Sequence, residues 1–253
     1  MDLNLKGKVA IVTGGGSGLG ASISEVLALE GANVVVNYFV DEANVFKFVD
    51  QLNEKYDTRA IPLYGDITKA SDIENVIART VDIYGKVDIL VNNAGVWPTA
   101  FVESMADEEW EKTIKINLTG PFMFSKRVVQ NLIGRKSKGK IINIVSQAAF
   151  HGSTSGHAHY AAAKGGVVTF TVSLAREVAK YGINVTAVAP GMMRTPMNKK
   201  ELAENEAKYI ERIPLGRISD PVEVAYTVAF LASDKADYIT GATIDVTGGM
   251  LMR

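Results

Sequence analysis

Tyr160 and Lys164 are the residues of this sequence whose types and spacing point most directly to chemistry. They are four positions apart in an alanine-rich stretch that should be helical, so both side chains leave one face of the same helix. An ammonium group beside a phenol favours the ionised phenol, which lowers the tyrosine pKa from its ordinary value of about 10. The pair is therefore a candidate proton carrier. A lone pair at this spacing also occurs on ordinary amphipathic helices, so the interpretation depends on the rest of the chain.

A glycine-rich turn near the start of the chain predicts a phosphate-binding site. Residues 8 to 13 form a short apolar run, and Gly14, Gly18 and Gly20 follow it, ahead of a helical pattern that closes at Gly31. Glycine has no Cβ, so the backbone can turn tightly and approach a pyrophosphate, whose charge is met by the helix N-terminus. A simple turn is the alternative, and the order of strand, turn and helix favours the nucleotide site.

Further apolar runs recur along the chain and alternate with amphipathic helical segments. Strands that alternate with helices indicate a parallel sheet covered on both faces. The sequence therefore predicts one Rossmann-like, doubly wound α/β domain over residues 1 to 253. About seven strands are expected, at residues 8 to 13, 33 to 37, 60 to 64, 87 to 91, 139 to 145, 183 to 188 and 242 to 246. Residues 191 to 219 depart from this rhythm with a charged helical insertion, which is predicted to be a substrate lid.

Two of the predicted strands end in residues suited to a ligand site. Asp66 and Ile67 follow the third strand, and residues 92 to 95, with the sequence Asn-Asn-Ala-Gly, follow the fourth. Open parallel sheets bind ligands at the carboxyl ends of their strands. Asn, Asp and Gly also dominate ordinary turns, so these residues alone decide nothing.

Composition excludes several classes of function. The 253 residues are 47% hydrophobic and carry a net charge of -1, which gives no sign of nucleic acid or an anionic membrane as partner. The absence of cysteine excludes disulfides, thiolate metal sites and a cysteine nucleophile. No signal-peptide pattern and no run of 18 or more apolar residues is present. The expected protein is soluble and cytoplasmic and uses no metal.

Taken together, the motifs resemble those of the classical short-chain dehydrogenases/reductases. The resemblance covers essentially the whole chain and is carried, in order, by residues 13 to 20, residues 92 to 95, Asn117, Ser146, Tyr160 with Lys164, and Pro190 with Gly191. Within this family the chain most resembles the 3-oxoacyl-[acyl-carrier-protein] reductases, at residues 229 to 234 and 238 to 250. It is also similar to the bacterial glucose 1-dehydrogenases, at residues 34 to 38.

The resemblance implies a role for each motif residue in the interconversion of a ketone and a secondary alcohol. Tyr160 would be the general acid in reduction and the base in oxidation. Lys164 would bind the nicotinamide ribose and hold the tyrosine pKa down, and Ser146 would hydrogen-bond the substrate oxygen. Asn117 would support a water that links Lys164 to solvent, and Thr195 would reach the nicotinamide carboxamide.

The complete set of predicted site residues follows from these motifs. The catalytic residues are Asn117, Ser146, Tyr160 and Lys164. The cofactor residues are Gly14, Ser17, Gly18, Leu19, Gly20, Asn37, Tyr38, Asp66, Ile67, Asn93, Ala94, Gly95, Tyr160, Lys164, Pro190, Gly191 and Thr195. The substrate residues are Ser146, Gln147, His157, Tyr160 and Met192.

The expected cofactor is NAD or NADP, and the preference between them stays open. An acidic residue after the second strand would bind the 2'-hydroxyl of NAD, and an arginine there or in the glycine turn would bind the 2'-phosphate of NADP. This chain has Asn37, Tyr38 and Phe39 at the first place and Ser17 at the second. Neither charge is present.

Several alternatives remain open on the sequence alone. A 3-oxoacyl-thioester reductase, whose substrate could be carried on acyl carrier protein, is the first hypothesis, and a sugar or polyol dehydrogenase is the second. A non-catalytic nucleotide-binding regulatory protein is an alternative of another class, because a fold does not fix a function. His151, His157 and His159 lie close together in the sequence and are not expected to bind zinc; His151 or His157, with Gln147, is expected to shape a substrate site. The family resemblance implies a homotetramer, with contacts through helices around residues 107 to 134 and 158 to 180.

Overall fold

The computed structural model describes residues 2–153 and 155–253. Its centre is one seven-stranded sheet in the order β3-β2-β1-β4-β5-β6-β7, with every neighbouring pair parallel. The strands are β1 (Val9–Thr13), β2 (Asn33–Tyr38), β3 (Ala60–Tyr64), β4 (Ile89–Asn92), β5 (Gly139–Ile144), β6 (Ile183–Pro190) and β7 (Thr243–Val246). The predicted fold class and the seven strands are confirmed. The largest differences are at β4, which begins two residues later than expected, and at β6, where pairing of Pro190 with Val246 extends the strand.

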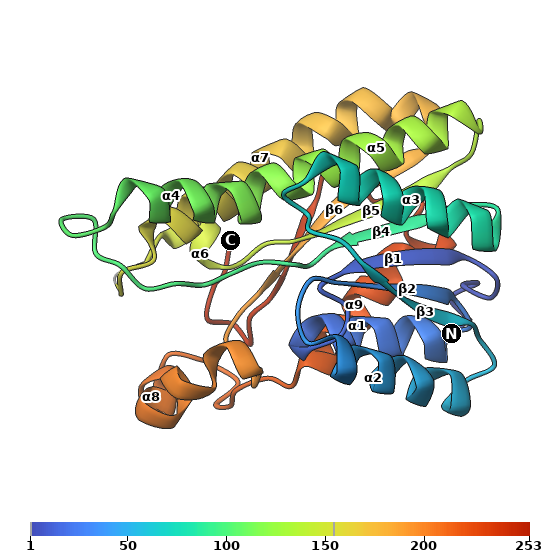
Figure 1. Cartoon of the computed structure of the whole chain (residues 1–253). Helices are drawn as coiled ribbons and strands as arrows, with labels where there is room; N and C mark the ends of the chain where they lie inside the picture. Colours follow the sequence, from blue (N-terminus) through green and yellow to red (C-terminus); the bar gives the residue numbers. More distant parts are fainter. Residues whose placement is uncertain (1, 154) are drawn as a thin grey trace.

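Helices cover both faces of this sheet (Figure 1). One face carries α1 (Gly18–Leu29), α2 (Glu42–Lys55) and α9 (Pro221–Ala232), and the other carries α3 (Ala70–Tyr84), α5 (Gly120–Gly134) and α7 (Ala158–Val178). Each face has its own apolar core, because the strands are buried on both sides and their side chains alternate between the two layers. This double burial explains why the strands appear in the sequence as continuous apolar runs.

The strand order reverses between β1 and β4, and this reversal places the site. Chain segments leave β1 toward one edge of the sheet and leave β4 toward the other, so their carboxyl ends diverge around a crevice. The glycine turn follows β1, residues 93 to 95 follow β4, and Ser146 lies just after β5. Segments far apart in the sequence therefore meet at a single edge of the sheet.

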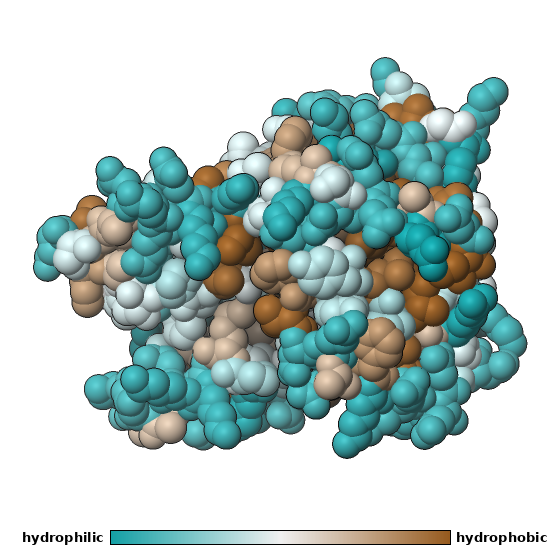
Figure 2. All heavy atoms as spheres, viewed as in Figure 1, coloured by the Kyte–Doolittle hydropathy of each residue, from teal (hydrophilic) through white to brown (hydrophobic). Residues whose placement is uncertain are grey.

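The segment after β6 forms a separate small unit beside that edge. It contains a 3-10 turn, η3 (Pro196–Asn198), and α8 (Lys199–Glu211), which stands apart from the two helix layers in Figure 1. Leu202, Ile213 and Ile218 form a small apolar core of their own here, with Met192 and Met250 packed against it. Hydrophilic side chains cover the outward face of this unit in Figure 2.

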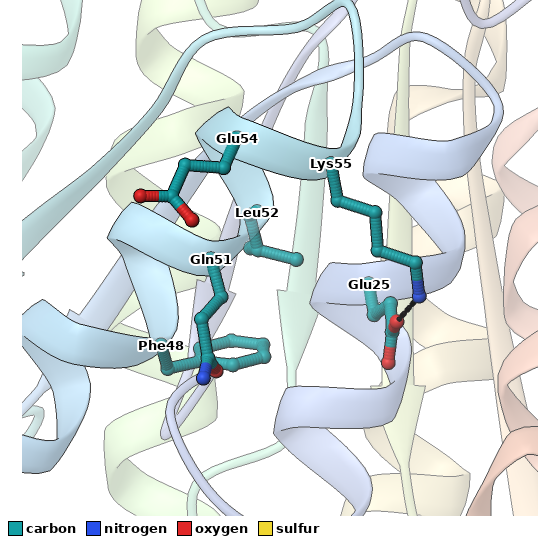
Figure 3. A pocket seen from close by; sticks show the side chains of 6 residues that line it. All are labelled: Glu25, Phe48, Gln51, Leu52, Glu54 and Lys55. Carbon is teal, nitrogen blue, oxygen red and sulfur yellow. Dashed lines mark hydrogen bonds and ion pairs between the residues drawn. The ribbon is translucent and has the colours of Figure 1, made fainter.

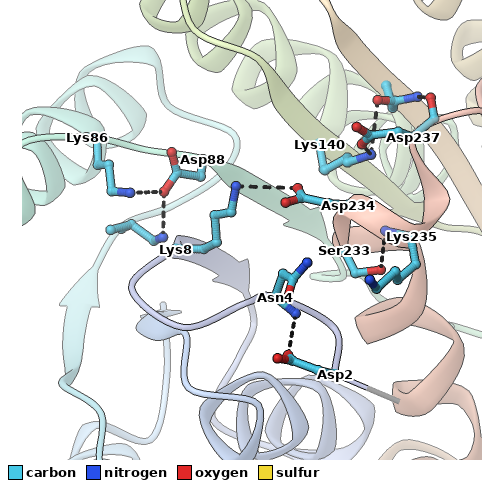
Figure 4. Close-up of polar contacts among 12 residues, drawn as sticks. Asp2, Asn4, Lys8, Lys86, Asp88, Lys140, Ser233, Asp234, Lys235 and Asp237 are labelled. Atoms are coloured by element: carbon cyan, nitrogen blue, oxygen red, sulfur yellow. Dashed lines mark hydrogen bonds and ion pairs between the residues drawn. The ribbon is translucent and has the colours of Figure 1, made fainter.

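The opposite edge of the sheet is closed by polar contacts (Figure 4). Asp88 accepts a hydrogen bond from the Val9 backbone N–H at 2.9 Å and pairs with Lys86 at 2.8 Å. Lys140, whose side chain is 8% exposed, pairs with Asp237 at 2.6 Å. These contacts join the amino ends of the central strands to the end of the chain, so this edge is structural and leaves the carboxyl edge for a ligand.

Within residues 2–153 and 155–253, no helix is both long enough and apolar enough to cross a bilayer.

Candidate active site

A cavity of about 220 Å³ lies at the carboxyl edge of the sheet. All five predicted substrate residues line it: Ser146, Gln147, His157, Tyr160 and Met192. Gly191 and Thr195, which were predicted to contact the cofactor, line it as well. Residues from four separate segments of the chain thus surround one space, and the sequence motifs that predicted chemistry converge there.

Tyr160 and Lys164 lie on α7, one turn apart, with the Lys164 Nζ 5.7 Å from the centre of the tyrosine ring. Burial raises the pKa of Tyr160 to about 12, and a hydrogen bond with Ser146 opposes this only partly. Burial also lowers the pKa of Lys164 to about 8. Burial therefore opposes the combination of a charged ammonium and an ionised phenol. In the protein alone the pKa of Tyr160 lies above its ordinary value, and the lowering of that pKa by Lys164 remains a prediction.

The Lys164 ammonium is fixed by the end of a strand. Its Nζ donates a 2.8 Å hydrogen bond to the backbone carbonyl of Ile144, the last residue of β5, and the residue is 4% exposed. A buried ammonium needs such partners, because desolvation of an unpaired charge is costly. This hydrogen bond sets the height of Lys164 above the sheet, and it leaves the other two N–H donors of the group for further partners.

Ser146 lies two residues beyond β5 and faces Tyr160 across the cavity wall. Its Oγ accepts a 3.2 Å hydrogen bond from the Ala148 backbone N–H, where the short helix α6 (Ala148–His151) begins, and the hydroxyls of Ser146 and Tyr160 both line the cavity. A serine hydroxyl and a tyrosine hydroxyl in the same cavity can both donate a hydrogen bond to one acceptor, such as the carbonyl oxygen of a substrate.

Asn117 is fully buried in a π-helical segment (Lys115–Thr119) that interrupts the helix between α4 (Asp107–Ile114) and α5. Its amide donates to the carbonyls of Val96 and Thr113, at 3.0 and 3.1 Å, and its Oδ1 accepts from the Val96 N–H at 3.2 Å. Gly95 makes this contact possible, because a Cβ there would lie 2.6 Å from the Asn117 Oδ1 and 3.7 Å from the Lys164 Nζ. Asn117 thus fixes the chain after β4 next to Lys164. Its predicted role in a water relay remains a prediction.

The glycine turn has the shape that a pyrophosphate requires. Gly14 and Gly18 have left-handed φ angles of 61° and 51°, and a Cβ on Gly20 would lie 2.0 Å from the carbonyl oxygen of Gly14. In the described chain, no side chain caps the N-terminus of α1, where Ser17 is the N-cap residue. Leu19 and Gly20 lie in this uncapped first turn, whose backbone N–H groups lack intrahelical partners and favour an anion. The turn therefore fits a dinucleotide.

Thr13 and Asn93 hold this turn against the end of β4. The Thr13 hydroxyl accepts hydrogen bonds from the N–H groups of Asn93 and Ala94, at 2.9 and 3.0 Å, and the Asn93 amide donates to the carbonyls of Thr13 and Gly14. The predicted cofactor residues of these two strands are thereby joined into one rigid rim. Thr13 belonged to the motif without a predicted role, and its position at the end of an apolar strand was the available signal.

The side chains of Asn37 and Tyr38, at the end of β2, are engaged within the protein. The Asn37 amide donates to the carbonyls of Leu63 and Gly65, at 3.2 and 3.1 Å, and the residue is 1% exposed. The Tyr38 hydroxyl donates to Glu42 at 2.8 Å, and burial raises the pKa of Tyr38 to about 12. The side chain that does project at this end is Phe39, which is 54% exposed.

The remaining predicted cofactor residues lie at the ends of β3 and β6. The Asp66 carboxylate accepts hydrogen bonds from the N–H and the hydroxyl of Thr68, and Ile67 is buried beside it. Pro190 ends β6, and the Gly191 N–H donates to the carbonyl of Val246 at 2.9 Å. The Thr195 hydroxyl donates to the Asn198 Oδ1 at 2.8 Å and so begins η3.

His157 and Gln147 present hydrogen-bond acceptors in the cavity wall. The His157 Nδ1 is 2.7 Å from the carbonyl of Pro98, which only accepts, so the neutral ring carries its proton on Nδ1, and the ring stacks on Trp97. Burial lowers the pKa of His157, which favours this neutral form. The Gln147 amide nitrogen is 3.2 Å from the Met250 sulfur, and its buried Oε1 has no partner in the described part of the chain.

Two residues of this wall were not among the predicted site residues. Met250 and Arg212 both line the cavity. Met250 lies in the segment of residues 238 to 250 that carries the family resemblance, and Arg212 lies in the predicted lid.

His151 and His157 both line the cavity, which agrees with their expected place at a substrate site. His159 does not line it, because it is fully buried and lies 3.7 Å from Glu109. Across residues 2–153 and 155–253, no group of three or more potential ligands could hold a metal ion.

A shallower hollow of about 410 Å³ lies between α1 and α2 (Figure 3). Glu25 and Lys55 form a 2.7 Å ion pair at its edge, and Phe48 and Leu52 supply its apolar wall. It contains none of the residues predicted to carry chemistry. The smaller cavity is therefore the candidate active site.

Comparison with known proteins agrees with this geometry. A family model described as Enoyl-(Acyl carrier protein) reductase matches residues 14–251. The 3-oxoacyl-[acyl-carrier-protein] reductase FabG of Vibrio cholerae is 42% identical over 250 residues, which are 99% of this chain and all of the relative. The chain belongs to the short-chain dehydrogenase/reductase family. It is accordingly an NAD(P)-dependent oxidoreductase that acts on CH–OH groups.

Other short-chain dehydrogenases/reductases show the same likeness over the whole chain. The FabG reductase of Escherichia coli is 40% identical over 99% of this chain and all of its own length. A solved structure from Brucella melitensis, titled a short-chain dehydrogenase/reductase of the glucose/ribitol dehydrogenase type, has a TM-score of 0.92 at 33% identity and 100% coverage of both chains. A dehydrogenase/reductase from Sinorhizobium meliloti has a TM-score of 0.93 at 33% identity, covering 99% of this chain and 98% of its own. The fold is therefore shared by family members whose titles name different substrates.

Proposed function

We propose that this short-chain dehydrogenase/reductase reduces a 3-oxoacyl thioester to the 3-hydroxyacyl thioester, with the substrate carried on acyl carrier protein. The observation that supports the proposal most directly is the common cavity of Ser146 and Tyr160, whose hydroxyls can both donate to one carbonyl oxygen. The substrate class is taken from the relatives at 40 and 42% identity, which are reductases of this type over their entire length.

The proposed reaction divides the work between the residues and the cofactor. The bound nicotinamide supplies the hydride. Ser146 orients the carbonyl by a hydrogen bond, and Tyr160 gives its proton to the oxygen as charge develops there. Lys164, held by the Ile144 carbonyl, stabilises the phenolate that results. In the reverse direction the same phenolate accepts the proton of the alcohol.

The residues that would hold the cofactor form a continuous rim. The pyrophosphate would bind at the uncapped N-terminus of α1 and the turn around Gly14 and Gly18. Asp66 with Ile67 and residues 93 to 95 would contact the adenosine and ribose groups, and Gly191 with Thr195 would hold the nicotinamide. Lys164 has donors left for the nicotinamide ribose hydroxyls.

We further propose that the enzyme prefers NAD to NADP. The Asn37 and Tyr38 side chains are engaged elsewhere, and no arginine or lysine occurs in residues 14 to 20 or 37 to 42 to receive a 2'-phosphate. Asp41 and Glu42 begin α2 just beyond Phe39, so the charge near this position is negative. Like charge disfavours a phosphate and tolerates a hydroxyl.

Residues 191 to 219 are proposed to be the substrate lid. Met192, Thr195, Met197 and Tyr209 line the cavity from this segment. The small core of Leu202, Ile213 and Ile218 lets the segment move as a unit relative to the two main layers.

The proposal also includes a cytoplasmic homotetramer. Phe122 on α5 is 45% exposed and makes an edge contact with Phe170 on α7, with the ring centres 5.9 Å apart. Phe170 is partly buried, so Phe122 is the exposed member of this pair, and aromatic side chains are enriched at protein interfaces. Light scattering of the purified protein tests the stoichiometry, and a monomer at micromolar concentration would contradict it.

A sugar or polyol dehydrogenase is the second candidate. The structure titled glucose/ribitol dehydrogenase matches the whole chain, and the acceptors of Gln147 and His157 would suit substrate hydroxyls. The experiment that separates the two is a NADH and NADPH oxidation assay with acetoacetyl thioesters, run beside NAD and NADP reduction with glucose and ribitol. Oxidation of the sugars without any thioester reduction would replace the first candidate by the second.

Tyr160→Phe tests the mechanism in either case. The variant keeps the ring and loses the proton, so its kcat should fall by a factor of roughly 100 to 10,000. Binding of NADH, followed by the change in its fluorescence, should be unaffected. Full activity in the variant would show that another group supplies the proton.

A further inference from the structure

Arg212 carries the permanent charge among the described residues that line the active-site cavity. It follows α8 directly and lines the cavity together with Ser146 and Tyr160. Within residues 2–153 and 155–253, no aspartate or glutamate lines this cavity. A charge on the wall of a cleft attracts ligands of the opposite sign.

The arginines on either side of the lid helix are neutralised within the protein, and Arg212 is not. Arg194 pairs with Glu206 through two hydrogen bonds of 3.1 and 2.6 Å. Arg217 pairs with Glu223 in the same two-pronged way, at 2.7 and 2.5 Å. Arg212 forms no ion pair or side-chain hydrogen bond with any residue among 2–153 and 155–253. Arg212 is exposed to solvent, so its guanidinium donors are free for water or for a ligand that enters the cavity.

One acidic group of the lid is engaged within the lid. Glu201 accepts hydrogen bonds from the Tyr209 hydroxyl at 2.9 Å and from the Asn205 amide at 3.2 Å, both at its Oε1. Tyr209 lines the cavity and Glu201 does not. Among the described residues of the wall, the permanent charge is therefore that of Arg212.

We propose that Arg212 binds an anionic group of the substrate, a carboxylate or a phosphate, while the carbonyl carbon lies at Ser146 and Tyr160. The planar guanidinium matches either anion through paired hydrogen bonds, and lid closure brings this contact to the substrate. The inference rests on the proposed ketone reduction at that cavity and adds a requirement for the distal end of the substrate. A phosphate would come from the pantetheine arm of a thioester, and a carboxylate from a free oxo acid.

Two matched pairs of ketones distinguish these sources. Acetoacetyl-CoA carries phosphates, and acetoacetyl-N-acetylcysteamine presents the same thioester without them. Levulinate carries a carboxylate, and its methyl ester does not. The quantity to measure is the ratio of kcat/KM for the charged member to that for the neutral member of each pair, in the wild type, in Arg212→Gln and in Lys208→Gln. Lys208 is exposed on the same helix and does not line the cavity, so it controls for the loss of one positive charge.

We expect Arg212→Gln to lower the charged-to-neutral ratio about tenfold in one pair, equivalent to about 1.4 kcal/mol, and Lys208→Gln to leave both ratios within about twofold. Arg212→Lys should restore part of the ratio. Unchanged ratios in both pairs, or an equal loss for charged and neutral members, would overturn the proposal, because the second result indicates a purely structural role.

A binding measurement keeps the proposal testable if the protein reduces none of these ketones, in which case only the proposed function has failed. The chain has two tryptophans, and Trp97 lines the cavity while Trp110 lies exposed on α4. In a Trp110→Phe background, titration with inorganic phosphate and with acetate should change the fluorescence of Trp97 in a saturable manner. The change should disappear in the Arg212→Gln variant. A response that is absent, or that survives the substitution, would overturn the site.

Discussion

Replacement of Lys164 by Met should separate the charge of this residue from its position. In reduction Tyr160 gives up its proton and becomes negative, so a positive Lys164 favours the products of that step. At the 5.7 Å that separates the Lys164 Nζ from the ring centre, a full charge stabilises the phenolate by roughly 3 kcal/mol with an effective dielectric constant of about 20. That energy corresponds to a rate factor of roughly 100.

The pH dependence follows from the pKa of the lysine. Burial lowers the pKa of Lys164 to about 8, and Tyr160, with a pKa of about 12, stays protonated throughout. The lysine charge is therefore present below about pH 8 and is lost above it. The kcat for reduction should fall as the pH rises through about 8, toward a plateau roughly 100-fold lower. In Lys164→Met the rate should lie on that plateau at every pH.

The assay is the initial rate of NADH oxidation between about pH 6 and pH 10, at saturating ketone, with NADH binding measured separately. Lys180→Met is a matched control, because Lys180 also lies near a tyrosine ring, 5.1 Å from the centre of Tyr181, and is outside the cavity. A Lys164→Met variant that keeps the inflection near pH 8, or more than about a tenth of the wild-type rate, would refute the reasoning.

Two further substitutions test the nucleotide turn and the opposite edge of the sheet. Gly20→Ala places a Cβ 2.0 Å from the Gly14 carbonyl, so we expect a loss of about 1–3 kcal/mol in stability and weaker NADH binding; unchanged thermal melting would contradict the contact. Asp237→Asn leaves the buried Lys140 without its ion pair, which should cost about 1 kcal/mol at pH 7 in urea denaturation. Lys140 lowers the pKa of Asp237 from 3.8, so the stability difference between wild type and variant should be present above pH 3.8 and should vanish as the pH falls through the lowered pKa of Asp237. A stability difference that persists in acid would exclude the charge of Asp237 as its cause.

The fold and the motif residues could be predicted because each has a local signature. Strands buried on both faces give continuous apolar runs, and these located all seven strands within a few residues. The glycine spacing is a signature because the first turn of α1 packs against the Gly14 carbonyl, where a Cβ on residue 20 would not fit. Tyr160 and Lys164 share a face because helical geometry fixes that spacing.

The electrostatics of the site could not be predicted in the same way. The spacing of Tyr160 and Lys164 suggested a charge pair, but the sequence does not report how deeply both groups are buried. Burial raises the pKa of Tyr160 and lowers the pKa of Lys164, so both shifts oppose the charged states that the spacing suggested. The contacts of Asn37 could not be predicted either. This residue was expected to contact the cofactor, but its amide donates hydrogen bonds to the carbonyls of Leu63 and Gly65, at the end of a neighbouring strand.

Two residues of the substrate wall could not be predicted, for a different physical reason. Met250 and Arg212 reach the cavity from the C-terminal segment and from the end of the lid helix, and neither residue type indicates a contact with the substrate. An arginine after a helix is usually solvated or paired, as Arg194 and Arg217 are here. Only the structure shows that Arg212, unlike Arg194 and Arg217, has no carboxylate partner in the described part of the chain. The chemistry of hydride and proton transfer is built into the sheet edge, which family members share, whereas the choice of substrate depends on contacts made by the lid. A change of substrate within this scaffold should therefore require substitutions in residues 191 to 219 and leave Ser146 and Tyr160 in place.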